Sequence, residues 1–365
     1  MHVPFNALGR QTDFLRPQID AAINRVLDSG WFIQGPEHDA FEREFAAYCG
    51  VAHCLGVGNG TDALELCLRA VGCGPGDEVI TVANAGMYAT SACVSMGATP
   101  VFADIDESSH LVDTTSLEDA ISPATRAIVV THLYGQLADV ESIVRTVAPL
   151  GISVIEDCAQ AHGARRDGKR AGSFADVAAF SFYPTKNLGA VGDAGAIVTD
   201  NDSIASRVRS LRQYGWDRKY NAAVPGGRNS RLDEMQAAVL RAKLQLLDEW
   251  NQRRRDIAEQ YRSVANGTDL RLLGTAGDEY VGHLCVGVHP DRDGLRAALA
   301  SLGIDTAIHF PTPDHRQPAL SSVVWRSPGL SVTDQAAREV LSLPCFPELT
   351  FQEIEHVCQS LDRAL

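Results

Sequence analysis

Lys186 and Asp157 are the two residues whose positions most strongly indicate chemistry. Lys186 lies in a loop directly after an apolar segment, Val177 to Phe180, and Asp157 follows a second apolar segment, Ile152 to Ile155. Open α/β sheets bind ligands at the carboxyl ends of their strands. An amine and an acid placed there suit the two ends of pyridoxal phosphate, because the lysine can condense with its aldehyde and the acid can keep its ring nitrogen protonated.

A candidate phosphate site precedes these residues in the chain. The segment Gly56 to Thr61 superficially resembles a dinucleotide-binding loop, but its sixth position is Thr61 rather than glycine or alanine, so the GxGxxG pattern fails. Gly60, Thr61 and Asp62 nevertheless fall where a strand is expected to turn into a helix. Free amides and the helix dipole attract anions at such a turn. Many α/β turns have this composition, so these residues alone do not decide the ligand.

The elements that must position these residues alternate between strand-like and helical patterns from about residue 54 to residue 199. Such alternation predicts an α/β fold with a mostly parallel sheet and helices on both faces. The expected strands are Cys54–Val57, Glu78–Val82, Thr99–Phe102, Ala127–Thr131, Ile152–Ile155, Val177–Phe180 and Ala196–Val198. Helices are expected at Thr61–Val71, Ala89–Met96 and Val140–Leu150.

The pattern changes after residue 214. Residues 214–229 contain several glycines and little apolar periodicity, so they are expected to form a long loop, and loops of that length are uncommon unless they are functional. The spacing of apolar residues then predicts one long helix from Arg231 to about Val264, with the run Arg253 to Arg255 solvated.

The rest of the chain is expected to form a smaller α/β unit. Its predicted elements are a strand at 283–288 and helices at 291–302 and 351–365. We therefore predict a large domain at residues 1–245, which includes the N-terminal segment, and a small C-terminal α/β domain at residues 246–365.

Composition excludes several classes of protein. The 365 residues carry a formal net charge of −14, which argues against a nucleic-acid surface. No segment approaches 18 consecutive apolar residues, and the N-terminus lacks a signal-peptide pattern, so no membrane partner is expected. The nine cysteines form no CxxC pair and are typical of reduced thiols in the cytosol. We expect a cytoplasmic protein without a metal site.

Four segments of the sequence resemble the DegT/DnrJ/EryC1/StrS sugar aminotransferases. They follow the family's order at similar separations and are Gly58–Leu64, Glu156–Gly163, Ser181–Gly189 and Gly227–Asp233. The resemblance covers nearly the whole chain and is weakest after about Ala265. It implies the fold type I of pyridoxal phosphate-dependent transferases, which is similar to aspartate aminotransferase, and a homodimer with shared active sites.

The resemblance also implies roles for individual residues. Lys186 would be the catalytic residue, Asp157 would contact the ring nitrogen of the cofactor, and Gln160 would face its ring hydroxyl. His162 would either support Asp157 or have a purely structural role. Asn229 would reach the phosphate of the other subunit's cofactor. The phosphate of the subunit's own cofactor would bind to Gly60, Thr61 and Ser181, and the substrate would contact Tyr183, Tyr220 and His309.

One segment departs from the family's pattern. Family members commonly place an aromatic residue after the second strand, where it stacks on the pyridine ring. The corresponding segment of this chain runs from Asn84 to Thr90 and does not have an aromatic residue at the matching position. Alignment back from Ala89 puts Met87 at that position. A thioether can pack on an aromatic ring, so Met87 is the expected cofactor contact, and Tyr88 would replace it if the loop shifts.

The resemblance predicts transfer of an amino group from L-glutamate to a nucleotide-linked 3-keto-6-deoxyhexose, with dTDP as the expected carrier. The segments Ser29–Gly35 and Leu211–Tyr220 are more similar to the 3-keto branch of the family than to the 4-keto branch. A 4-keto-6-deoxyhexose aminotransferase acting on a dTDP-, UDP- or GDP-sugar and a non-catalytic nucleotide-sugar sensor stay open. A related dehydratase would carry histidine in place of Lys186, and an aldolase that uses only a lysine would not need Asp157.

Overall fold

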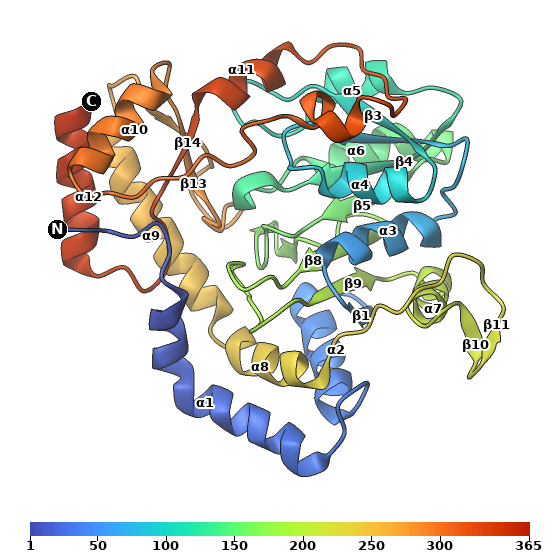
Figure 1. Cartoon of the computed structure of the whole chain (residues 1–365). Coiled ribbons are helices and arrows are strands. Elements are labelled where there is room, and N and C mark those ends of the chain that lie inside the picture. Colours follow the sequence, from blue (N-terminus) through green and yellow to red (C-terminus); the bar gives the residue numbers. More distant parts are fainter.

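A seven-stranded sheet forms the centre of the computed structural model, which describes all 365 residues (Figure 1). Its strands are β1 His53–Val57, β2 Glu78–Val82, β3 Thr99–Ala103, β4 Thr125–Thr131, β5 Ser153–Asp157, β8 Val177–Ser181 and β9 Gly195–Thr199. They lie in the order β1-β9-β8-β5-β4-β2-β3, and only β9 runs antiparallel to its neighbours. The predicted mostly parallel sheet is therefore confirmed, with every expected strand within two residues of its predicted ends.

Helices cover both faces of this sheet. Successive side chains of a strand point to opposite faces, and in β2 Val79 packs in one core cluster while Ile80 packs in another. The helices in the first part of the chain are α1 Leu8–Ser29, α2 Pro36–Cys49, α3 Gly60–Ala70, α4 Tyr88–Ser95, α5 Thr114–Ala120, α6 Val140–Val147 and α7 Asp202–Leu211. Of these, α1 packs on Ala238 and Val239 rather than on the sheet. The expected helices correspond to α3, α4 and α6, whereas α1, α2, α5 and α7 were not anticipated.

The predicted long helix is wrong, because the chain breaks at Gln245 and Leu246 into α8 Glu234–Leu244 and α9 Leu247–Ala265. The two helices bury their apolar faces against different cores. Leu240 of α8 packs with the large sheet, whereas Tyr261 of α9 packs in a separate cluster with the C-terminal elements. A single straight helix would not place apolar side chains in both cores.

A second, three-stranded sheet in the order β12-β13-β14 lies beside α9, on the side that faces the large sheet (Figure 1). The C-terminal elements are β12 Arg271–Leu272, β13 Cys285–Val288, α10 Arg292–Ser301, the short helices η3 Asp314–Arg316 and η4 Pro318–Leu320, α11 Ser331–Glu339, β14 Val340–Leu343 and α12 Phe351–Ala364. The N-terminal residue Val3 also packs here, since its amide donates to Gly303 and its carbonyl accepts from Asp305.

The domain boundary at residue 245 stays a prediction, and one segment crosses it. Arg326 belongs to the second part of the chain, yet it forms a bridge with Val101 of β3 and an ion pair with Glu78 of β2. Asp104, which follows β3, accepts a hydrogen bond from the amide of Thr333 at 2.8 Å. The segment that contains η3 and η4 therefore rests on the edge of the large sheet.

Residues 214–229 are not a featureless loop. They contain a two-stranded ribbon, β10 Trp216–Arg218 paired with β11 Asn221–Ala222, which projects from the molecule beside α7 (Figure 1). All nine cysteines are unpaired, and eight of them are buried. None of the helices is both long and apolar enough to span a lipid bilayer.

Candidate active site

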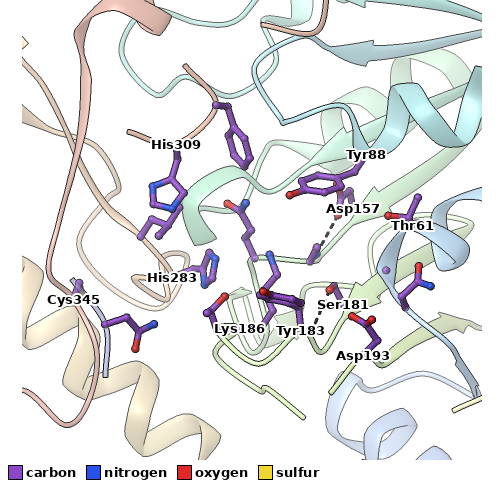
Figure 2. A pocket seen from close by; sticks show the side chains of 18 of the residues that line it. Thr61, Tyr88, Asp157, Ser181, Tyr183, Lys186, Asp193, His283, His309 and Cys345 are labelled. Atoms are coloured by element: carbon purple, nitrogen blue, oxygen red, sulfur yellow. Dashed lines mark hydrogen bonds between the residues drawn. The ribbon is translucent and has the colours of Figure 1, made fainter. Parts of the chain in front are cut away.

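A cavity of about 630 Å³ opens at the carboxyl ends of β5 and β8, beside the N-terminus of α3 (Figure 2). Residues of the second sheet and the N-terminal segment close its other side, among them Asn6, His283 and Leu343. The cavity brings together most of the predicted site residues, which are Gly60, Thr61, Asp157, Gln160, Ser181, Tyr183, Lys186 and His309. Met87, Tyr220 and Asn229 do not line it.

Lys186 presents an amine without a partner. Its loop is fixed by its own backbone, because the Lys186 amide donates to Tyr183 at 2.8 Å, and by the buried Lys243, whose Nζ donates to the carbonyl of Gly189 at 2.8 Å. The Lys186 Nζ itself makes neither a hydrogen bond nor an ion pair within the chain. Burial lowers its pKa to about 8, against the opposing effect of the Asp157 charge. Near neutral pH the unprotonated form of this amine is therefore far more populated than that of an exposed lysine.

Asp157 provides a buried acid in the same cavity and is only 4% exposed. Its carboxylate accepts hydrogen bonds from the amide of Ala159 at 3.1 Å and the hydroxyl of Thr131 at 3.4 Å, and no basic side chain forms an ion pair with it. Burial raises the pKa of this carboxyl, while the Ala159 amide and the Lys186 charge act in the opposite direction. A buried carboxylate with no cationic partner fits a protonated ring nitrogen, which would supply the missing charge.

The neighbouring acid, Glu156, has a structural role. It is fully buried and accepts hydrogen bonds from the amides of Gly172 at 2.9 Å and Phe174 at 2.8 Å. It also pairs with His132 at 3.0 Å, and the His132 amide donates to the Asp157 carbonyl. Sequence reasoning did not identify this support, although strand alternation offered a signal, since adjacent residues of β5 point to opposite faces.

Gln160 is oriented by a backbone contact that the sequence did not reveal. The amide of Tyr134 donates to its Oε1 at 2.6 Å. Because this bond occupies the acceptor of the Gln160 side chain, the amide nitrogen is left to donate into the cavity. That arrangement fits the oxygen of a ring hydroxyl.

The turn before α3 has the features of an anion site. Asn59 caps the helix by accepting from the Asp62 amide at 2.8 Å, so the amides of Gly60 and Thr61 stay free. Gly60 is required by close packing, because a Cβ there would lie 2.5 Å from the Cβ of Ser181. The acid in this turn is neutralised, since Arg228 pairs with Asp62 at 2.9 Å.

Met87, the expected cofactor contact, does not line the cavity, whereas Tyr88, the alternative if the loop shifts, does. Gly86 and Met87 both adopt left-handed backbone conformations, with φ of 85° and 70°. This shift starts α4 at Tyr88 and directs its ring to the cavity, near Asp157 (Figure 2). The Met87 side chain packs instead with Phe102 and Leu320. A left-handed non-glycine residue costs about 1–2 kcal/mol, so other contacts must hold the loop.

The remaining predicted residues have varied surroundings. His309 lines the cavity and its Nδ1 lies 2.7 Å from the hydroxyl of Ser342. His162 has no hydrogen bond to Asp157 and packs between the rings of Phe180 and Phe182. Burial lowers the pKa of His309 to about 4 and of His162 to about 3, with the Lys186 charge as a second cause in both.

Tyr220 and Asn229 lie outside the cavity of their own chain, and both are exposed. Tyr220 forms the tip of the β10–β11 ribbon and is 79% exposed. Asn229 stands between Arg228 and Ser230, which both contact Asp62. These two residues can therefore act at a cavity only by loop movement or from another subunit.

Arg254 was expected to be solvated, but it is buried and lines the cavity, with 5% of its surface exposed. It lies on the face of α9 that packs toward the second sheet, and its Nη1 donates to the carbonyls of Gly282 at 3.4 Å and Cys345 at 2.5 Å. No carboxylate forms an ion pair with it, and its Nε has no partner. The sequence did not single out Arg254, because it stands in a run of three arginines that nothing in the local sequence distinguishes from one another.

The sequence profile of the DegT/DnrJ/EryC1/StrS aminotransferase family matches residues 14–362. The chain belongs to this family. Members depend on pyridoxal phosphate, and the free Lys186 amine, the unpaired Asp157 carboxylate and the open turn at Gly60 fit that cofactor. The chain is thus a pyridoxal phosphate-dependent aminotransferase with the α/β fold of such enzymes.

Three relatives cover nearly the whole chain. A dTDP-3-amino-3,4,6-trideoxy-alpha-D-glucose transaminase of Streptomyces venezuelae is 47% identical and covers 95% of this chain and 92% of its own. A dTDP-3-amino-3,6-dideoxy-alpha-D-galactopyranose transaminase of Aneurinibacillus thermoaerophilus is 44% identical, with 99% of both chains covered. The "erythromycin biosynthesis sensory transduction protein EryC1" of Saccharopolyspora erythraea is 45% identical, also with 99% of both covered.

A solved structure has the same fold. The crystal structure of S. venezuelae DesV in complex with a ketimine intermediate matches with a TM-score of 0.95 and 45% identity. The match covers 99% of this chain and 98% of that one.

Proposed function

We propose that this aminotransferase moves an amino group from L-glutamate to the C3 keto carbon of a dTDP-linked 6-deoxyhexose. Amination at C3 and a dTDP carrier are supported by the names of the Streptomyces and Aneurinibacillus relatives. Transamination is supported most directly by one observation, the free amine of Lys186 in the same cavity as the buried carboxylate of Asp157.

Each residue then has a defined task. Pyridoxal phosphate, when bound, supplies an aldehyde that combines with amines and a ring that accepts electrons from the reacting carbon. Lys186 takes the proton released from the Cα of glutamate and, in the second half of the reaction, delivers a proton to C3 of the sugar. Asp157 would hold the proton of the ring nitrogen, and Gln160 would donate to the ring oxygen. Gly60, Thr61 and Ser181 would bind the phosphate.

A carboxylate-bearing donor is supported by the surroundings of Arg254. A buried guanidinium that has only carbonyl partners keeps an uncompensated positive charge, which is costly in a protein interior. A donor carboxylate entering this end of the cavity would supply the counter-charge. His309 and Tyr183 line the same cavity and remain candidates for contacts with the sugar nucleotide.

A homodimer with composite sites is part of the proposal. Gln213 donates to Gln34 at 2.7 Å, which joins the ribbon region to the segment after α1. This joint face exposes large aromatic side chains, among them Tyr220 and Trp31, the latter 58% exposed. Exposed apolar patches of this kind are typical of protein interfaces. A two-fold partner would cover them and bring Asn229 to the neighbouring phosphate.

A nucleotide-sugar sensor is the second candidate, because one relative is named a sensory transduction protein. A sensor needs sugar binding but neither the lowered pKa of Lys186 nor a buried acid partner. The deciding assay supplies the pure protein with pyridoxal phosphate, glutamate and a panel of dTDP- and UDP-linked 3-keto and 4-keto sugars. Glutamate consumption should be fastest with a dTDP-linked 3-keto sugar. Binding without consumption of glutamate for every sugar would favour the sensor.

A further inference from the structure

A buried carboxylate from the second part of the chain holds the loop that carries Tyr88. Asp314 of η3 is only 2% exposed. Its Oδ1 accepts a hydrogen bond from the amide of Met87 at 2.8 Å, and its Oδ2 accepts one from the hydroxyl of Thr90 at 2.5 Å. In return, the Asp314 amide donates to the carbonyl of Ala83 at 2.8 Å. The loop and η3 are thus joined in both directions.

The same segment also supports Tyr88 through packing. The ring of Phe310 lies against Gly86, where a Cβ would come within 2.4 Å of its Cε1. Phe310 also meets the Tyr88 ring edge to face, with 6.3 Å between the ring centroids. Tyr88 therefore has an aromatic neighbour on the side of the second sheet, and Asp314 fixes the backbone one residue before it.

We propose that Asp314 is a positioning residue that aims Tyr88 at the cofactor ring by holding Met87 in its left-handed conformation. Without the carboxylate, the Met87 amide loses its acceptor and the loop is free to leave this strained backbone state. α4 would then no longer begin at Tyr88, and the ring would leave its place in the cavity (Figure 2). The inference rests on the proposed function in one respect, that Tyr88 faces bound pyridoxal phosphate.

The charges around Asp314 predict a pH dependence of this contact. No basic side chain pairs with Asp314, because His315 and Arg316, which follow it in η3, both pair with Asp334 of α11. On the loop, the only titratable group is the Tyr88 phenol, whose pKa is raised, chiefly by burial. Burial raises the pKa of Asp314 to about 6, while its hydrogen bonds oppose that change. Below about pH 6 the carboxyl is protonated and accepts fewer hydrogen bonds from the loop.

A double-mutant cycle separates positioning of Tyr88 from a general effect on the fold. The dissociation constant of pyridoxal phosphate is measured by absorbance for the wild type, Asp314→Ala, Tyr88→Ala and the double variant. Alanine is used because asparagine would keep an oxygen that can accept from the Met87 amide. An aromatic contact predicts about 2- to 12-fold weaker binding for Asp314→Ala. In the Tyr88→Ala background the same substitution should change binding by less than about twofold, because the contact is already absent.

Amide hydrogen exchange of residues 86–91 provides a readout without cofactor. Exchange should be faster in Asp314→Ala, and in the same direction but less in Thr90→Val, which removes only the hydroxyl donor. Asp291→Ala is the matched control, since Asp291 caps α10 through the Gly294 amide at 3.0 Å and has no contact with the loop. Affinity for the cofactor in the wild type should fall below about pH 6, and this step should be absent in Asp314→Ala.

Equal loss of affinity in both backgrounds, or unchanged exchange at residues 86–91, would overturn the role of Asp314 while leaving the proposed function intact. Failure of the wild type to bind pyridoxal phosphate would contradict the proposed function itself, and with it the role given to Tyr88.

Discussion

Replacement of Asp157 by asparagine tests how much the buried charge contributes to turnover. Asparagine keeps the shape of the side chain and an oxygen that can accept from the Ala159 amide, so the fold around β5 should persist. The substitution removes only the negative charge. Asp193 is the only other acid that lines the cavity, and it lies beyond Ser181, away from Asp157 (Figure 2), so it is not placed to replace the lost charge.

The size of the effect follows from burial. Two unit charges about 4 Å apart at an effective dielectric constant of about 20 interact by about 4 kcal/mol. This figure is a ceiling, because Asp157 also carries a desolvation cost that raises its pKa. Loss of one preorganised electrostatic partner typically costs about 2.7–4 kcal/mol of the barrier. We therefore expect kcat of Asp157→Asn to fall about 10²- to 10³-fold.

The assay must separate binding from chemistry. Single-turnover mixing of cofactor-loaded enzyme with glutamate, followed by absorbance, measures the first half of the reaction directly. Cofactor affinity should change far less than the rate, since the charge matters most as electrons enter the ring. A cofactor-saturated Asp157→Asn enzyme that reacts within about threefold of the wild type would refute the role of this carboxylate.

Four further results are expected. Gly60→Ala should weaken cofactor binding, because its Cβ would lie 2.5 Å from Ser181, whereas Gly74→Ala, with open space around it, should not. Arg254→Lys should raise the KM for glutamate and leave the reaction of the aminated enzyme with the sugar nearly unchanged, as measured in separate half-reactions. The rate at which pyridoxal phosphate reacts with the cofactor-free protein should rise with pH, with an apparent pKa of about 8, because only the neutral amine of Lys186 reacts. Mixed dimers of Lys186→Ala and Asn229→Asp subunits should recover up to about half of the wild-type activity, and no recovery after verified subunit exchange would exclude a shared site.

Local patterns predicted much of this fold. Each strand of the large sheet is a short apolar segment between turn residues, so β2 and β8 could be placed nearly to the residue. The sequence also predicted that Lys186 and Asp157 belong to one site, since both come at the carboxyl end of a strand. The neighbouring strands β5 and β8 bring those ends together. The order of the strands was not predictable in this way, because it depends on contacts between distant segments.

The features that the sequence did not predict all depend on partners far along the chain. Tyr88 replaces Met87 because Asp314, 227 residues beyond Met87, binds the Met87 amide. Arg254 looks like its neighbours in sequence, and only the packing of α9 against the second sheet decides which arginine is buried. Local spacing contains no information about either contact.

The most direct test of the central claim is to locate the bond between the protein and its cofactor. The protein is loaded with pyridoxal phosphate, reduced with borohydride, digested and analysed by mass spectrometry. The account predicts that the peptide containing Lys186 carries the reduced cofactor and that Lys186→Ala gives no labelled peptide. A label on another lysine, such as the buried Lys243, or no label on a protein that still consumes glutamate, would contradict it.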